Sequence, residues 1–287
     1  LSLIYVKAVR DVIGDGANVS IRNSLNKGFY TKIKTNRELT LELIGQVEKR
    51  MREIVEEDLP FKKEVLSRDN AIECLHKDGR FERARLIETA PNLTQVFFYD
   101  LDGYRDFYYT LMAPSSGYID LFELRKYKNG ILLRFPHPSN PSVVPEFVDE
   151  SKMYQAFAEQ TVWERLLGVS YVADLNEKIA NDEAKDLIQL SEALHEKKIA
   201  QIADMINKEH KRIILIAGPS SSGKTTFAQR LCVQLRVNGL EPLYLGTDDY
   251  FVNREDTPLD EHGEKDYENL DALDIELFNN NMNDLLA

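Results

Sequence analysis

Hydrophobic residues recur with a helical period over residues 40–58, "TLELIGQVEKRMREIVEED". Most of the remaining positions are charged, so the segment has one apolar face and one polar face. This pattern predicts an amphipathic helix that buries one side. The positions expected on the buried face are Leu41, Ile44, Val47, Met51, Ile54 and Val55.

Two other segments of the first half have a β pattern interrupted by a turn dipeptide. Residues 95–111 are rich in aromatic and branched side chains around "DG", and residues 121–135 repeat this arrangement around "NG". Asp-Gly and Asn-Gly favour the tight turns of β-hairpins. Two hairpins together with helices predict an α+β domain with an antiparallel sheet over residues 1–136.

A proline-rich stretch follows this region. Residues 136–145, "PHPSNPSVVP", hold four of the ten prolines and are typical of a linker. Residues 150–209 are mostly helical in pattern, and "HEKKIAQIADMINKE" places isoleucines on one stripe with charges elsewhere. We therefore expect a linker and helical connector over residues 137–210.

The last region opens with a different pattern. Residues 212–217, "RIILIA", are almost continuously apolar, as in a strand buried on both faces of a parallel sheet. A glycine-rich loop, a helical pattern ending at Gly239 and a second apolar run at 241–247 follow. This order predicts the start of an α/β P-loop NTPase domain over residues 211–287.

We expect this last domain to be incomplete. Only 70 residues run from Gly218 to Ala287, whereas a doubly wound nucleotide domain needs more than ~100. The chain as given is therefore expected to have little or no catalytic turnover by itself.

The glycine-rich loop reads "GPSSSGKTT" and has the spacing of a phosphate-binding loop. Gly218 and Gly223 allow positive φ, so that successive N–H groups and the following helix dipole hold phosphate oxygens. Lys224 would bridge the β- and γ-phosphates, and the Thr225 hydroxyl would ligate Mg²⁺. ATP and Mg²⁺ are the predicted cofactors. The predicted ATP-binding residues are Gly218, Ser220, Ser221, Ser222, Gly223, Lys224, Thr225 and Thr226.

An acidic segment follows the second apolar run. Eleven acids lie between Asp248 and Asp274, against the two bases Arg254 and Lys265. Asp248 comes at the carboxyl end of the predicted strand, where ligands bind in such sheets. A carboxylate there can accept a proton from an attacking hydroxyl and hold Mg²⁺. A solvated acidic loop is the other interpretation of the same residues.

The motifs "GPSSSGKTTFAQRL", "TDDYF" and "YENLDALD", in this order, resemble the uridine kinase/phosphoribulokinase family. The resemblance implies an ATP-dependent kinase for the 5′-hydroxyl of a nucleoside, with Asp248 and Lys224 catalytic and with Thr225 and Asp248 holding Mg²⁺. The substrate-binding residues that it implies are Glu268, Tyr250 and Asp271. Glu268 stands where many members have Asp, and the family's His-Pro pair is absent, so the acceptor stays open.

The first half resembles another family. "SLNKGFY" (24–30), residues 49–73 and "MAPSSGYI" (112–119) are similar to the second additional domain of threonyl- and alanyl-tRNA synthetases, over about residues 1–135. In that family the domain hydrolyses mischarged tRNA with an H-x-x-x-H pair and a C-x-x-x-H pair. Here Tyr108, Met112 and Leu3 stand at three of those positions. The resemblance thus implies the domain without its editing residues.

Composition bears on the partners and the location. The net charge of −12 argues against non-specific binding to nucleic acid or anionic membrane, although it leaves open a local basic patch. The resemblance to the kinase family implies ATP and a small-molecule nucleoside as the partners, with nucleic acid not expected. No run approaches ~18 apolar residues, so no membrane span is expected. The two cysteines, Cys74 and Cys232, form no C-x-x-C pair, and a cytoplasmic protein is predicted. A homo-oligomer is left open.

Three functional hypotheses remain on the sequence. The order of synthetase-like region, helical connector and kinase-like region resembles uridine kinase-related proteins of that architecture, which favours a nucleoside kinase. A nucleotide-dependent regulatory protein or tRNA-binding protein that uses the synthetase-like region is the second hypothesis. A kinase for another small hydroxylated metabolite is the third.

Overall fold

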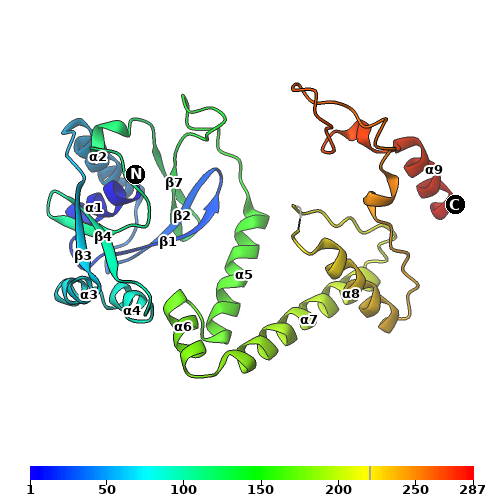
Figure 1. The fold of residues 1–287 in the computed structure, drawn as a ribbon, viewed down its shortest axis with the longest axis horizontal. Coiled ribbons are helices and arrows are strands. Elements are labelled where there is room, and N and C mark those ends of the chain that lie inside the picture. The colour runs from blue at the N-terminus through cyan, green and yellow to red at the C-terminus, as the bar shows by residue number, and fades with distance from the viewer. Residues whose placement is uncertain (220) are drawn as a thin grey trace. The chain divides into compact units, whose positions relative to one another are not determined.

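The computed structural model describes residues 1–219 and 221–287, so Ser220 lies outside the described residues. Contacts divide the chain into two compact units, Leu1–Ala184 (unit 1) and Lys185–Ala287 (unit 2). The ribbon of each unit can be followed in Figure 1. Among the described residues, no helix is both long and apolar enough to cross a bilayer.

Unit 1 has two antiparallel sheets and several helices, which confirms the predicted α+β fold. One sheet has four strands in the order β1-β2-β7-β6, and the other has three in the order β3-β4-β5. The strands are β1 (Asn18–Leu25), β2 (Gly28–Lys34), β3 (Lys62–Ser67), β4 (Gln95–Leu101), β5 (Tyr104–Phe107), β6 (Glu123–Tyr127) and β7 (Gly130–Arg134). Both predicted hairpins form, as β4–β5 and β6–β7.

Unit 1 also contains helices before, between and after these strands in the chain. They are α1 (Ser2–Ile13), α2 (Leu41–Glu56), α3 (Arg68–Lys77), α4 (Phe81–Glu88), the short 3-10 helix η1 (Ser116–Tyr118), α5 (Ser151–Leu167), α6 (Val172–Ala180) and the first residue of α7 (Ala184–Lys208). The helix predicted over residues 40–58 is therefore confirmed as α2. Its first turn is capped by Thr40, whose side chain accepts a hydrogen bond from the backbone N–H of Leu43 at 3.2 Å.

The main core of unit 1 lies between the four-stranded sheet and helices α1 and α2. Met51 and Ile54 of α2, Leu3 of α1 and Ile131 and Leu133 of β7 are fully buried in this one cluster. The periodicity of α2 thus did identify its buried face, except at its first residue, Leu41, which is 73% exposed.

Helices α3 and α4 pack against the three-stranded sheet and form a second, smaller core. A charged group is buried beside it. The carboxylate of Asp106 on β5 is 1% exposed and pairs with Arg80 at 2.5 Å and Arg83 at 3.2 Å. A buried carboxylate needs such partners, because desolvation of an unpaired charge is costly.

The segment that follows the proline-rich stretch packs on the other face of the four-stranded sheet. Tyr127 donates a hydrogen bond to Asp149 at 2.6 Å, and Asn26 donates its amide to the carbonyl of Val148. Tyr154 of α5 stacks edge-on against Tyr127, with ring centroids 5.7 Å apart. This sheet is therefore covered on both faces within unit 1.

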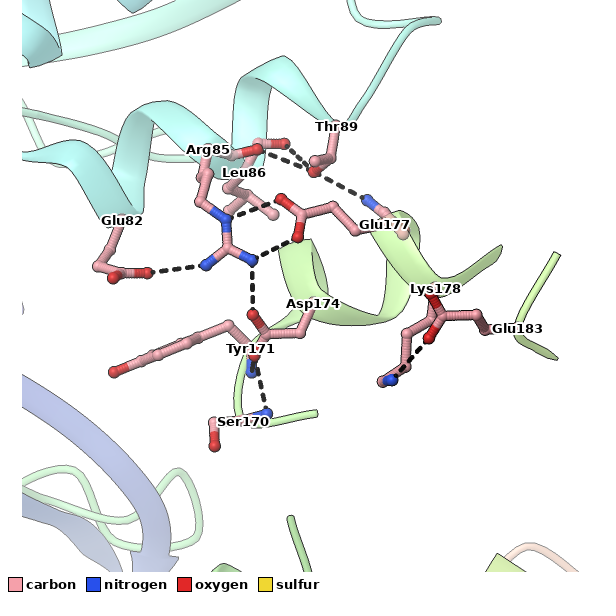
Figure 2. Close-up of polar contacts among 11 residues, drawn as sticks. Glu82, Arg85, Leu86, Thr89, Ser170, Tyr171, Asp174, Glu177, Lys178 and Glu183 are labelled. Carbon is pink, nitrogen blue, oxygen red and sulfur yellow. Dashed lines mark hydrogen bonds and ion pairs between the residues drawn. The ribbon is translucent and has the colours of Figure 1, made fainter. Parts of the chain in front are cut away.

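An ion-pair cluster joins α6 to α4 (Figure 2). Arg85 of α4 binds both carboxylate oxygens of Glu177, at 2.8 and 2.7 Å, and Asp174 at 2.7 Å. The second oxygen of Asp174 accepts hydrogen bonds from the backbone N–H groups of Ser170 and Tyr171, which immediately precede α6. The same carboxylate therefore caps α6 and docks it on α4.

Unit 2 is built on the packing of α7 against α8 (Lys224–Val237). Ile199 and Ala203 of α7 are fully buried against Leu231 and Leu235 of α8, which confirms both predicted helices. The 3-10 helices η2 (Thr247–Tyr250) and η3 (Leu270–Ala272) and helix α9 (Ile275–Leu286) complete the described elements.

The two strands predicted in this region do not form. Residues 212–217 and 241–246 are unpaired coil in the structure, and their apolar side chains are largely exposed, with Leu215 at 87% and Leu243 at 65%. A strand requires a hydrogen-bonded neighbour, and neither run pairs with a strand among the described residues. The α/β P-loop NTPase domain predicted here is thus not seen as a sheet.

We expect Met51→Ala to destabilise unit 1 by about 2–5 kcal/mol, because it leaves a cavity under α2. Leu41→Ala on the same helix should change the free energy of unfolding by less than about 0.5 kcal/mol, because that side chain is mostly exposed. Urea unfolding of the whole chain, followed by the fluorescence of its single tryptophan, Trp163, measures both. Equal losses in the two variants would contradict the observed core.

Acid should loosen the docking of α6 on α4. Hydrogen bonds from Arg85 lower the pKa of Glu177. Partial burial acts to raise the pKa of Asp174, but hydrogen bonds from Arg85 and from the start of α6 outweigh it and lower that pKa as well. A carboxylate with a lowered folded-state pKa adds stability above its unfolded value of about 4, and that stability is lost as pH falls through the folded value.

We therefore expect the urea midpoint of the wild type to fall more between pH 7 and pH 3 than the midpoint of Arg85→Gln. Arg165→Gln on α5, whose side chain makes no ion pair among the described residues, is the matched control and should follow the wild type. An identical pH dependence in Arg85→Gln and the wild type would contradict the role of this cluster.

Candidate functional site

The glycine-rich loop leads directly into α8. Gly223 is the residue before the helix and has φ 85°, while Ser221 has φ 58°. Gly218 does not have the positive φ expected of it. A Cβ at this position would lie 2.8 Å from the Ser222 hydroxyl, which would have to turn away, so glycine allows the close approach of these two residues.

The start of α8 is electrostatically suited to an anion. It has no side-chain cap and no acidic residue in its first turn, so its backbone N–H groups are not taken by a carboxylate. Lys224 folds back over the loop and donates to the carbonyls of Gly218 at 2.8 Å and Pro219 at 2.9 Å. The described loop residues thus fit a phosphate group, which Lys224 could reach by exchanging one carbonyl for it.

The predicted acidic residues are held in a separate substructure of unit 2. Asp248 lies exposed on η2, and no hydrogen bond or ion pair connects it to the glycine-rich loop among the described residues. Tyr250, predicted to bind substrate, is instead buried against Phe278 of α9 with ring centroids 5.1 Å apart. Its hydroxyl accepts a hydrogen bond from Asn281 at 3.2 Å. This tyrosine therefore anchors α9 to η2.

The other two predicted substrate residues shape local turns. The backbone N–H of Glu268 donates to the Asp266 side chain at 3.1 Å, and that of Asp271 donates to Asn269 at 3.0 Å. Both acidic side chains are exposed. Among the described residues no group of three or more His, Cys, Asp or Glu side chains could hold a metal ion.

In unit 1 the positions of the synthetase editing residues lie together in the main core. Leu3 is fully buried there, and Tyr108 and Met112 pack against the same cluster. Burial raises the pKa of the Tyr108 hydroxyl, which therefore stays neutral at ordinary pH. Apolar contact replaces the imidazole and thiol groups, so these three residues have no means to activate water or hold a metal.

The motif "MAPSSGYI" has a structural role in this arrangement. Ser116 is buried, donates to the carbonyl of Ile54 at 2.6 Å and accepts from the N–H of Leu59 at 2.8 Å. The N–H of Gly117 donates to Asp58 at 2.9 Å, and a side chain at Gly117 would collide with that carboxylate. The motif is thus hydrogen-bonded to the C-terminal end of α2 and to the residues that follow this helix.

One feature of unit 1 has no counterpart in the sequence motifs. A hollow of about 350 Å³ opens at the end of β2 and is lined by Ile33, Thr35, Arg37, Glu38, Leu39, Lys126, Lys128, Asn129 and Gly130. Its three cations come from two places almost 90 residues apart in the chain. No local pattern could have indicated them, because only the pairing of β2 with β7 brings these places together.

Comparison with known proteins shows similarity over part of the chain. The threonine–tRNA ligase of Marinobacter nauticus is 34% identical over 111 residues, which are 39% of this chain and 17% of that protein. Those of Paraburkholderia xenovorans and Burkholderia lata are 33% and 34% identical over 119 residues, 42% of this chain and 19% of each relative. No family model matches the chain. The chain thus has a synthetase-like region and spans less than a fifth of the length of these relatives.

The comparison contradicts our interpretation of the chain as a nucleoside kinase. The relatives are threonine–tRNA ligases, and uridine kinase or phosphoribulokinase is therefore the wrong enzyme class and family for it. Three short motifs rich in Gly, Ser and acids were the basis of that hypothesis. The structure neither pairs the predicted strands around them nor connects Asp248 with the loop among the described residues.

The expected partners need the same correction. Our exclusion of nucleic acid and our choice of a nucleoside are contradicted by relatives whose name couples them to tRNA. Net charge was the wrong measure, because it averages over all 287 residues. Phosphates respond to the charges within a Debye length of about 8–10 Å.

Proposed function

We propose that this protein binds tRNA through unit 1 and a nucleotide through the glycine-rich loop of unit 2. The observation that carries the proposal is the similarity to threonine–tRNA ligases, which extends over 39–42% of the chain. The synthetase-like motifs that we recognise, at 24–30, 49–73 and 112–119, all lie in unit 1.

Binding without hydrolysis is the mode that the structure supports best. Leu3, Tyr108 and Met112 stand where the synthetase domain has its editing groups, and all three are packed in or against an apolar core. The backbone arrangement of the motif is nevertheless stabilised, since Ser116 and Gly117 hydrogen-bond to residues at the C-terminal end of α2 and just after it. A domain that keeps this backbone arrangement but has no reactive groups at those three positions favours recognition of tRNA over cleavage of an aminoacyl bond.

The glycine-rich loop supplies the proposed nucleotide site. The uncapped start of α8 and the Lys224 ammonium would hold the phosphates of ATP. The remaining residues of this proposed site are Gly218, Ser221, Ser222, Gly223, Thr225 and Thr226, with Ser220 outside the described residues. Mg²⁺, if it accompanies ATP, would be held by the Thr225 hydroxyl and the Asp248 carboxylate. A cytoplasmic location, where tRNA is charged, belongs to the same proposal.

The whole chain should bind tRNA with a dissociation constant in the micromolar range near 50 mM salt. Binding should weaken steeply as salt rises, because phosphate contacts release counterions. Fluorescence anisotropy of labelled tRNA, titrated at several salt concentrations, measures this, with a duplex DNA of equal charge as the control. Absence of tRNA binding up to ~100 μM protein at 50 mM salt would refute the proposed function.

Lys224→Ala should weaken the binding of a non-hydrolysable ATP analogue by about 10- to 100-fold, since one charge-assisted hydrogen bond contributes about 1.5–3 kcal/mol. Lys211→Ala removes an equal charge from an exposed side chain that pairs with Glu209 at 3.3 Å, away from the loop. Its affinity should match that of the wild type. Calorimetric titration with and without Mg²⁺ tests this, and equal affinities in both variants would remove the loop from nucleotide binding.

A further inference from the structure

The hollow at the end of β2 exists because the two neighbours of this strand differ in length. β1 pairs with β2 from Leu25 opposite Gly28 to Asn18 opposite Lys34. β7 pairs with β2 only as far as Thr31, where the β6–β7 turn leads the chain away. Beyond Thr31, β2 has no strand on its β7 side within the described sheet, and the space is open to solvent.

Three cationic side chains surround this opening. Lys126 is the last but one residue of β6 and Lys128 lies in the β6–β7 turn, while Arg37 lies in the loop between β2 and α2. All three residues are exposed. Glu38 is the single carboxylate that lines the hollow, and none of the three cations forms an ion pair within the described residues.

Two of the three cations, Arg37 and Lys128, are positioned by contacts that leave donors available. One Arg37 Nη donates to the carbonyl of Val12, at the end of α1, at 3.0 Å. Lys128 Nζ donates to the Ser151 hydroxyl at 3.0 Å. These contacts use one of five guanidinium hydrogens and one of three ammonium hydrogens. The rest can bind an anion in the hollow.

Asn129, in the same turn, adds neutral donors. Its side-chain oxygen accepts hydrogen bonds from the hydroxyls of Tyr30 at 2.6 Å and Tyr154 at 3.0 Å. Two hydroxyl donors fix the orientation of the amide, so that the nitrogen points away from them. The two amide hydrogens have no partner among the described residues, and Asn129 lines the hollow. The site therefore presents three cations and one amide, against the single carboxylate of Glu38, beside the apolar residues Ile33 and Leu39.

We propose that this hollow binds phosphodiester groups of an RNA backbone. This inference rests on the tRNA binding proposed above and locates it at one site on unit 1. An exposed pair of single charges contributes only about 0–1 kcal/mol, so a lone phosphate would gain little here. A polyanion gains more, because adjacent phosphates meet several cations at once and release counterions. An open surface on which three cations outnumber one carboxylate thus favours a nucleic acid strand over a small free anion.

The test removes two of the charges and replaces each with a neutral polar side chain. Arg37→Gln combined with Lys126→Gln should weaken tRNA binding by the whole chain about 10- to 30-fold at 100 mM salt. The slope of log K against log salt should fall by about 1.5, because each phosphate contact contributes about 0.7–0.9. Far-UV circular dichroism and the urea midpoint check that the variant folds.

The matched control is Lys49→Gln combined with Lys62→Gln. It changes the net charge equally, at exposed residues of α2 and β3 outside the hollow. This control should keep the wild-type slope and affinity. Both double variants should keep the wild-type affinity for the ATP analogue, which belongs to unit 2.

The outcomes separate this inference from the proposed function. If the wild type binds tRNA and the two double variants have the same slope, the hollow is not the site and the proposed function stands. If the wild type binds no tRNA, both fail. A titration with inorganic phosphate distinguishes the remaining case. The inference is overturned if phosphate binds with a dissociation constant below ~100 μM that depends on Arg37 and Lys126, while the double substitution leaves tRNA binding unchanged. The hollow would then be a site for a free anion.

Discussion

Packing of α1 and α2 against one face of the four-stranded sheet holds unit 1 together. Leu3, Met51 and Ile131 are completely removed from solvent in that interface, which has the density of contacts that makes cores intolerant of cavities. The opposite face of the sheet is covered by the segment around Tyr154. Along the described part of this sheet the covered positions lie mainly on its inner strands, while β1 keeps exposed positions such as Ile21.

This constraint decides what the synthetase-like region can do. The positions that would carry editing groups belong to the interface or pack against it, and apolar side chains there exclude ions and water. A buried polar contact in the same core joins the Tyr5 hydroxyl to Thr31 at 2.8 Å, and burial raises the pKa of Tyr5 to about 12. That hydroxyl stays neutral and serves the packing of α1. In the proposed function this place has no reactive group, and binding falls to the outer surface.

The local charge differs between parts of this protein and departs from the net charge of the whole chain. The chain is acidic overall, and much of the excess lies in residues 248–274, where eleven acids face two bases. At the end of β2, three cations meet one carboxylate. Because screening limits the range of each charge to about a Debye length, a polyanion approaching unit 1 responds mainly to the local set. The same reasoning applies to the start of α8, whose first turn carries no acid.

The sequence by itself determined the elements whose stabilising contacts are local or periodic. The stripe of α2, the turns of the two hairpins and the helix after the glycine-rich loop all follow from spacing and turn chemistry, since each is set within a few neighbours. Prediction from the sequence failed where the hydrogen-bonding partner of a segment is distant in the chain. Residues 212–217 and 241–247 have the composition of strands, but no strand among the described residues pairs with them. Only the tertiary structure decided that Tyr250 is buried and that Arg37 and Lys126 line one hollow, because burial and strand pairing bring together residues that no local pattern relates.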